Sequence, residues 1–299
     1  MLEPHLFYPP RRRGLVFHAV GISLLGLLSA GCFLLGLRQE AGGYFALWML
    51  LSLFFFVPLV LVVYRAYALL RARYLIEREG LRLRWGLRVE DIPVTRVEWI
   101  RPVSDLPYRL RLPFLAWPGA ILGSVHVEDL GEVEFLAADE STLLLVATPQ
   151  RVYAISPADP KAFLRVFHRM MELGSLEPLI HRSVQPTAFF RLIWEDRLAR
   201  WLILLGAGLV LLLFTGVSLI IPTRAEVSLG FSSNGTPLPG VPAAQLLLLP
   251  VLSAFALGID LLGGLFFYRQ PEDRVLAFFL WFSGVLMPLL MLVALALIL

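Results

Sequence analysis

Asp260 is the residue whose type and setting most clearly suggest chemistry. It is the only formal charge in the apolar stretch Val241–Tyr268. A carboxylate at membrane depth costs roughly 2.5–3.5 kcal/mol on insertion scales, so such a group normally faces protein or water. It could couple protons or ions during transport. Alternatively, it is a protonated or hydrogen-bonded acid that fixes helix packing, with Thr215, Ser218 or His18 as its partner.

Small residues surround this carboxylate in the sequence. Gly258, Gly263 and Gly264 lie within four positions of Asp260, and such residues let helices approach closely. This pattern favours the packing interpretation. His18 is the second polar residue that we expect inside the membrane, because it lies within the apolar stretch near the N-terminus.

The remaining reactive residue types do not form a catalytic pattern. The five histidines are scattered, and the sequence has no His-Glu-x-x-His motif. It has neither a Gly-x-Ser-x-Gly elbow nor a phosphate-binding glycine loop. An aspartyl protease needs two carboxylates that share a proton, and the single cysteine, Cys32, is embedded in apolar sequence where thiols are inert. We therefore expect a protein without catalysis, cofactor or metal site.

The composition is typical of an integral membrane protein. Hydrophobic residues make up 58% and charged residues 16% of the 299 residues, against about 25% charged in soluble domains. The net charge is +3, and no basic cluster is interleaved with aromatic residues, so we expect no nucleic acid partner. Crossing a bilayer takes about 20 apolar residues. The stretches of that length are Gly14–Leu37, Ala41–Tyr64, Trp201–Ile221, Val241–Tyr268 and Val275–Leu299.

Arginines near the ends of these stretches predict the orientation. Arg11, Arg12 and Arg13 precede the first stretch, whereas the loop that follows it carries Arg38 alone. The flanks of the long polar segment are also rich in arginine, as is the turn Arg269–Arg274. Because positive residues stay in the cytoplasm, we expect a multi-pass cell-membrane protein with a cytoplasmic N-terminus, a cytoplasmic soluble segment and an external C-terminus.

The polar segment predicts one soluble domain at residues 72–175, between a two-helix hairpin at residues 1–71 and a linker at residues 176–200. Several short β-type runs are separated by proline and glycine, and Leu81–Val89 alternates apolar residues with arginines. Asp159 can cap a helix that begins at Pro160. We therefore expect a small β-barrel closed by a C-terminal helix.

Residues of about 73–173 resemble a bacterial pleckstrin-homology (PH-like) domain. The resemblance lies in "LIEREGLRLRWGL", "WPGAILGSVHVEDLGEVEFLA" and "LLLVATPQRVYAISPADPKAFLRVF". It implies a binding or assembly module and supplies no catalytic residues. Arg82, Arg84 and Arg88 could form a face for anionic lipid or a partner; alternatively they are a solvated strand face.

Two segments could lie at the membrane surface. The charge-free stretch Leu112–Leu122 either dips into the interface with Trp117 at headgroup level or belongs to the core. Thr187–Arg200, which contains Trp194, either lies along the surface or extends the next membrane helix, which begins near Trp201.

The C-terminal three-helix region, residues 201–299, carries a second resemblance. Residues of about 209–292 are similar to the membrane region of Sdp-type toxin-immunity proteins, in the "NGTP" turn, the Leu-rich helix with Pro250 and the Tyr268-Arg269 exit. Together the sequence features predict a scaffold, sensor or immunity-type binder in the lipid bilayer, with a protein partner or its own copies. The alternative is a transport-related protein that binds a small or lipophilic ligand and uses Asp260 to couple protons.

Overall fold

The computed structural model describes residues 5–114, 116–173, 182–184, 186–228, 230, 234 and 239–298. The chain divides into two compact units. One unit combines Met1–Leu27 with Phe56–Pro186, and the other combines Leu28–Phe55 with Thr187–Leu299. Both helices of the N-terminal hairpin therefore contribute residues to both units.

Within the described residues, five helices are long and apolar enough to cross a membrane, as the sequence predicts. They are α1 (Arg12–Leu37), α2 (Gly43–Arg71), α5 (Arg197–Ile220), α6 (Leu248–Tyr268) and α7 (Arg274–Ile298). At two places the helices and the apolar stretches have different ends. Helix α2 continues past Tyr64 to Arg71, because Ala68 and Leu69 on its last turns are buried in the core of the soluble domain. Val241 lies in a two-residue strand, and a short 3₁₀ helix (η4, Ala243–Leu247) precedes α6.

The first sheet of the soluble domain is antiparallel and has the order β1-β2-β3-β4-β10. Its strands are β1 (His5–Phe7), β2 (Arg73–Ile76), β3 (Gly80–Trp85), β4 (Arg88–Pro93) and β10 (Arg182–Val184). Strand β1 was not predicted: the residues before α1 pair with the strand that follows α2. The N-terminus is therefore part of this sheet as well as the start of the hairpin.

The second sheet has the order β5-β8-β9-β7-β6, with β7 and β9 parallel and the other neighbours antiparallel. Its strands are β5 (Trp99–Pro102), β6 (Ile121–Val127), β7 (Gly131–Ala137), β8 (Leu144–Ala147) and β9 (Val152–Ile155). The predicted closed barrel is wrong, because the sheets are two separate five-stranded layers. A short 3₁₀ turn (η1, Val94–Arg96) leads the chain from β4 in one sheet to β5 in the other.

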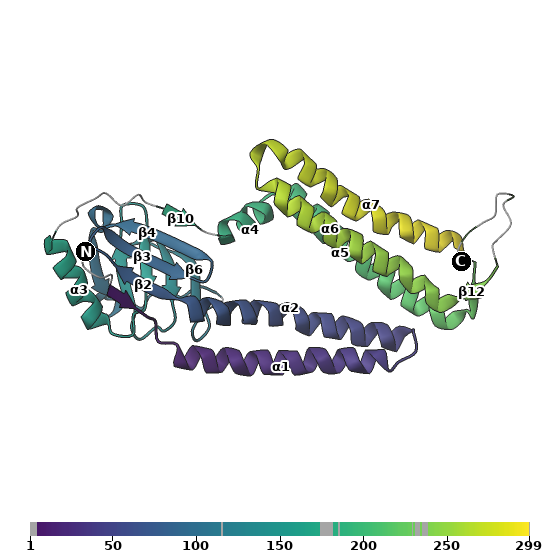
Figure 1. Ribbon diagram of the computed structural model, residues 1–299, viewed down its shortest axis with the longest axis horizontal. Coiled ribbons are helices and arrows are strands. Elements are labelled where there is room, and N and C mark those ends of the chain that lie inside the picture. Colours follow the sequence, from purple (N-terminus) through teal and green to yellow (C-terminus); the bar gives the residue numbers. More distant parts are fainter. Residues whose placement is uncertain are drawn as a thin grey trace. The chain divides into compact units, whose positions relative to one another are not determined.

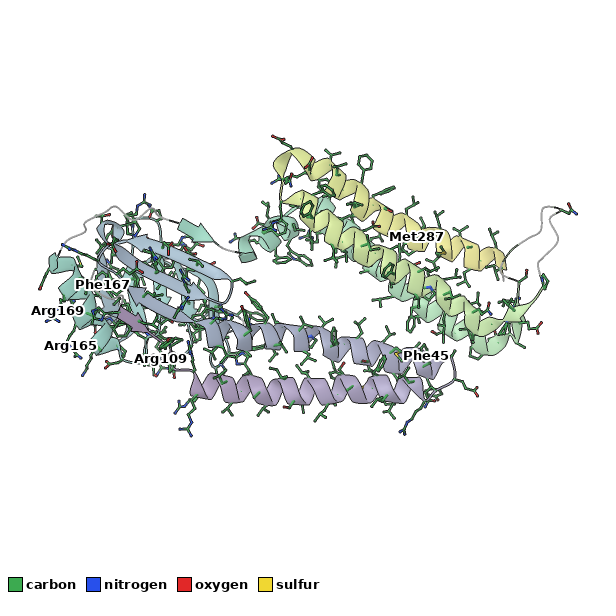
Figure 2. All side chains as sticks on the ribbon, in the orientation of Figure 1. Phe45, Arg109, Arg165, Phe167, Arg169 and Met287 are labelled. Carbon is green, nitrogen blue, oxygen red and sulfur yellow. The ribbon has the colours of Figure 1, made fainter. Side chains whose placement is uncertain are left out.

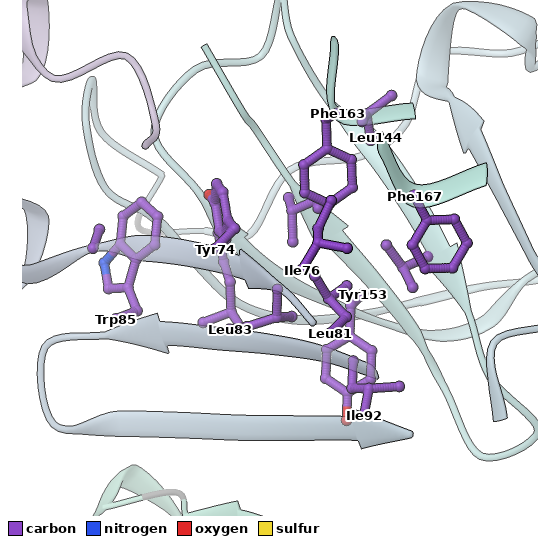
Figure 3. Packing of buried hydrophobic residues seen from close by; sticks show 14 of the residues in the cluster. Tyr74, Ile76, Leu81, Leu83, Trp85, Ile92, Leu144, Tyr153, Phe163 and Phe167 are labelled. Carbon is purple, nitrogen blue, oxygen red and sulfur yellow. The ribbon is translucent and has the colours of Figure 1, made fainter. Parts of the chain in front are cut away.

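The main core lies between the two sheets and is closed by α3 (Pro160–Leu173), as Figures 1 and 3 show. Tyr74 and Leu83 of the first sheet, Leu144 of the second and Phe163 of the helix are fully or almost fully buried there. The predicted helix start is confirmed: a carboxylate oxygen of Asp159 accepts a hydrogen bond from the backbone N–H of Ala162 at 2.9 Å.

The outer face of the second sheet is also buried. Its side chains include Val133, Phe135 and Leu145, and the segment that leads from β5 to β6 covers them with Leu110, Leu106 and other apolar residues. A sheet that is apolar on both faces explains why β8 and β9 are buried at every position.

The second unit contains α5, α6 and α7, which pack on one another. A short helix, α4 (Pro186–Glu195), precedes α5, and β11 (Glu226–Val227) pairs with β12 (Val241–Pro242) in the connection between α5 and α6. Two 3₁₀ turns, η3 (Ile221–Thr223) and η5 (Pro271–Asp273), end α5 and precede α7. One apolar cluster lies near each end of the three-helix bundle.

Candidate functional site

The soluble domain is joined to its helices by packing as well as by the chain. Ala68, Leu69 and Ala72 at the end of α2 are fully or almost fully buried and belong to the core between the sheets. The guanidinium of Arg11, just before α1, donates a hydrogen bond to the carbonyl oxygen of Ala72 and stacks on the ring of Tyr8 at 4.4 Å. In this unit the domain and the adjoining ends of α1 and α2 therefore form one packed body.

One cavity of the domain is an open groove of about 1250 Å³. Residues 102–110, the turn at residues 139–144 and the first part of α3 form its walls. Its charged residues have both signs and are Arg109, Asp139, Glu140, Asp159 and Lys161. Sites for small molecules usually measure about 300–1,000 Å³ and are mostly enclosed, so a groove of this size and mixed charge is better suited to a polypeptide segment.

The structure separates the three arginines of the predicted face. Arg82 and Arg84 lie on the wetter face of β3, and Arg82 forms ion pairs with Glu77 at 3.2 Å and Asp91 at 3.7 Å. Arg88 does not share this face. Gly86, with φ +60°, and Leu87 form a two-residue turn, so Arg88 pairs with Trp85 and points toward the core.

Arg88 belongs to a buried ionic network that joins the two sheets. Its guanidinium donates to Glu90 on the same strand at 2.9 Å and to Glu134 on β7 at 2.5 Å. Arg151, just before β9, donates to the other carboxylate oxygen of Glu134 at 2.7 Å. The hydroxyl of Tyr153 lies 3.4 Å from Glu90. Burial, and then the Glu90 charge, raise the pKa of Tyr153 far above its usual value.

Sequence reasoning did not find this network, although a signal for it exists. Glu90 faces Leu83 across the hairpin, and Glu134 lies between Val133 and Phe135, which are fully buried. An acidic residue at a buried strand position needs a cation nearby. Because the network is inside the domain, it does not offer Arg88 as a lipid-binding group; the binding role of Arg82 and Arg84 stays a prediction.

The stretch Leu112–Leu122 has features of both predicted alternatives. Ala120 and Ile121 are buried as core residues, whereas Phe114 is 100% exposed. Trp117 is half-buried against α1 and α2. The guanidinium carbon of Arg65 lies 4.4 Å from the centre of its ring, a cation–π contact.

His18 is fully buried in α1, and its Nδ1 donates to the carbonyl oxygen of Gly14 at 2.6 Å. Within the described residues, its Nε2 has no hydrogen-bond partner. That His18 is a polar residue buried in a membrane span stays a prediction.

In the second unit, Asp260 lies where α5, α6 and α7 approach closely. It is 9% exposed, and the hydroxyl of Ser283 on α7 is a polar group near it. A β-carbon on Gly284 would lie 3.6 Å from a carboxylate oxygen of Asp260, and one on Gly206 of α5 would lie 3.0 Å from the carbonyl oxygen of Gly284. Ser283 was not among the predicted partners. The predicted partner Thr215 instead donates its hydroxyl hydrogen to Leu211.

Residues 186–200 form a separate helix followed by the start of α5, which combines the two predicted alternatives. Helix α4 ends at Glu195, and Asp196 caps α5 by accepting from the N–H groups of Leu198 and Ala199. The other carboxylate oxygen of Asp196 accepts from the hydroxyl of Tyr268 at 2.9 Å. Trp194 and Trp201 are both exposed, as residues of an interfacial belt would be, and that role stays a prediction.

The comparisons with known proteins agree with the fold of the first unit. Residues 72–170 match the family model of the bacterial PH domain, which confirms the predicted resemblance over this segment. Together with the five apolar helices, the match indicates a membrane-associated protein that carries a PH-like domain. Neither a curated protein nor a solved structure matches the chain. No finding bears on the Sdp-type resemblance of residues 209–292, which stays a prediction.

Proposed function

We propose that this chain is a non-enzymatic integral membrane protein whose PH-like domain binds or assembles proteins at the cytoplasmic membrane face. Its role is that of a scaffold, a sensor or an immunity-type binder. The observation that carries the proposal is the open groove of about 1250 Å³ beside the start of α3. The domain that holds this groove is packed onto α1 and α2, so a protein bound there is kept close to the bilayer.

The cytoplasmic placement is supported by the arginines at the helix ends. Arg12 and Arg13 lie at the start of α1, Arg71 lies at the end of α2, and the PH-like domain connects to both ends. The groove has no catalytic pattern among its lining residues: it combines two cations and three carboxylates with proline and leucine side chains. Such a surface recognises a polypeptide by charge and shape.

The experiment is an affinity purification of the full-length protein in mild detergent, followed by mass spectrometry. Wild type is compared with Arg109→Glu/Lys161→Glu, which reverses both cations of the groove. The matched control is Arg165→Glu/Arg169→Glu, which makes the same charge change at exposed positions of α3 outside the groove (Figure 2).

The proposal is supported if a protein, or a second copy of the chain, copurifies in a fixed ratio with the wild type and the control but not with the groove variant. A partner retained equally by all three proteins contradicts the groove as the binding surface. If all three retain a small molecule or lipid and no protein, the transport-related alternative is favoured instead.

A further inference from the structure

The segment that connects the two outer strands of the second sheet carries a fully exposed aromatic side chain. Phe114 is 100% exposed, although Leu112 and Ala116 on either side of it pack against the outer core of the domain. Exposing a whole phenylalanine ring to water is unfavourable by about 1.5–3 kcal/mol relative to burying it. The segment is therefore held to the domain on both sides while its tip points away from the protein.

The same segment is held against the domain-side ends of α1 and α2. The ring of Trp117 packs edge-on against Phe17 of α1, with 6.2 Å between ring centroids, and stacks on Arg65 of α2. The backbones of Gly14 and Gly119 touch: a β-carbon added to Gly14 would lie 2.5 Å from the Cα of Gly119. Gly119 has φ +82°, a conformation suited to glycine.

These contacts fix the level of the segment along α1, at the point where the exposed side chains of the helix change from cationic to apolar. Arg12 and Arg13 are exposed at the start of α1 and cannot enter the hydrocarbon, whereas the exposed side chains of Val16 and Phe17, one turn further on, suit lipid. Trp117 contacts Phe17, so it lies at the boundary, where tryptophan is favoured in membrane proteins. Phe114 is three residues from Trp117 and belongs to the same packed unit.

A cavity beside the segment adds cationic groups at the same level. It measures about 610 Å³, and residues 10–14 and 116–119 form most of its walls; its charged residues are Arg11, Arg12, Arg13, Asp139 and Glu140, so cations are in excess by one. Neither Arg12 nor Arg13 has an ion-pair partner among the described residues. An exposed aromatic side chain close to the arginines at the start of α1 matches the interface of a bilayer that contains anionic phospholipid.

We infer that residues 112–114 and 116–117 belong to a membrane-docking element of the PH-like domain, which inserts Phe114 into the bilayer interface and holds the domain against the membrane surface. This inference goes beyond the proposed function, because it concerns the orientation of the domain and does not depend on a protein partner.

The test labels position 114 in the full-length protein. Cys32 is replaced by serine, Phe114→Cys is introduced and labelled with bimane, and the protein is reconstituted into vesicles of phosphatidylcholine and phosphatidylglycerol. The lipids carry bromine near the top of one acyl chain. The control label is placed at Arg169→Cys, an exposed position of α3 at the part of the domain away from α1 and α2 (Figure 2).

The label at position 114 is expected to show blue-shifted emission and to lose most of its intensity to the brominated lipid. The label at position 169 is expected to keep its emission wavelength and its intensity. Equal quenching at the two positions, or none at position 114, overturns the inference. High salt screens exposed charges but leaves apolar insertion intact, so quenching at position 114 must persist there. Loss of quenching in salt also overturns insertion.

Discussion

Replacing Arg88 by methionine is expected to destabilise the PH-like domain severely. Methionine has a similar apolar stem, so the change removes the charge and leaves most of the packing. The side chain of Glu90 is 0% exposed, and Arg88 pairs with it through two guanidinium nitrogens at 2.9 and 3.1 Å. The hydroxyl of Tyr153, which lies 3.4 Å from Glu90, carries no charge that could replace the guanidinium.

Removing one partner of a buried ion pair costs about 3–5 kcal/mol, because it leaves an uncompensated charge in the interior. The replacement removes less stabilisation from the carboxylate of Glu134 than from that of Glu90, because Arg151 still pairs with Glu134 at 2.7 Å. We therefore assign most of the loss to Glu90. Domains are stable by only about 5–15 kcal/mol, so this loss is a large fraction of the total.

The assay is a urea titration of the full-length protein in detergent, read by brief proteolysis and by mass spectrometry of fragments from residues 72–170. The midpoint of Arg88→Met should fall by more than about 1 M, given a urea dependence of about 1–3 kcal/mol per M. Arg165→Met makes the same change at an exposed position of α3, and its stability should stay within about 0.5 kcal/mol of wild type.

The double variant Arg88→Met/Glu90→Leu separates charge from packing. It also removes the buried carboxylate of Glu90, so it should recover a large part of the stability that Arg88→Met loses. An unchanged midpoint for Arg88→Met, or a double variant less stable than the single one, would refute the reasoning.

Three further predictions concern single positions. Tyr74→Phe should cost about 1–3 kcal/mol, because the phenol makes two buried hydrogen bonds. Burial also raises the pKa of Tyr74 far above its usual value, so the stability of the wild type should fall as the pH rises above about 10. This fall should be smaller in Tyr74→Phe. If urea titrations at several pH values show the same loss of stability with pH for both proteins, the prediction is contradicted. Gly264→Ala should lower the thermal stability of the protein in detergent by about 1–3 kcal/mol, because a β-carbon there would lie 2.1 Å from Nε1 of Trp281. The control is Gly258→Ala, which should leave the stability unchanged because a β-carbon at Gly258 meets nothing within 4 Å. Asp260→Asn keeps the volume and a hydrogen-bonding group, so thermal unfolding should shift by less than about 1.5 kcal/mol; a larger loss would show that the carboxylate itself is required.

Local signals in the sequence predicted much of the fold. The five apolar helices follow from the length of the apolar stretches, and the Asp159–Pro160 start of α3 follows from capping chemistry. The alternation in β3 also holds, with Leu81, Leu83 and Trp85 buried on one face. These features depend only on neighbours within a few residues.

The errors arise where the structure depends on distant partners or on a change of register. The period of two cannot be carried through the turn at Gly86, so Arg88 was assigned to the wrong face. Strand β1 is three residues long and is stabilised by pairing with β2, nearly 70 positions later in the chain. The end of α2 has the composition of a membrane flank, and only the packing of Ala68 and Leu69 shows that it belongs to the domain core.

The two surfaces proposed for the PH-like domain adjoin each other. Asp139 and Glu140 line both the open groove and the cavity beside Arg12 and Arg13. If the segment around Phe114 lies in the headgroup layer, a protein in the groove must bind within reach of that layer. Its surface must therefore tolerate anionic headgroups, which repel acidic side chains. This geometry favours a partner that is itself bound to the membrane, because such a partner loses less freedom of motion on binding than a protein recruited from solution.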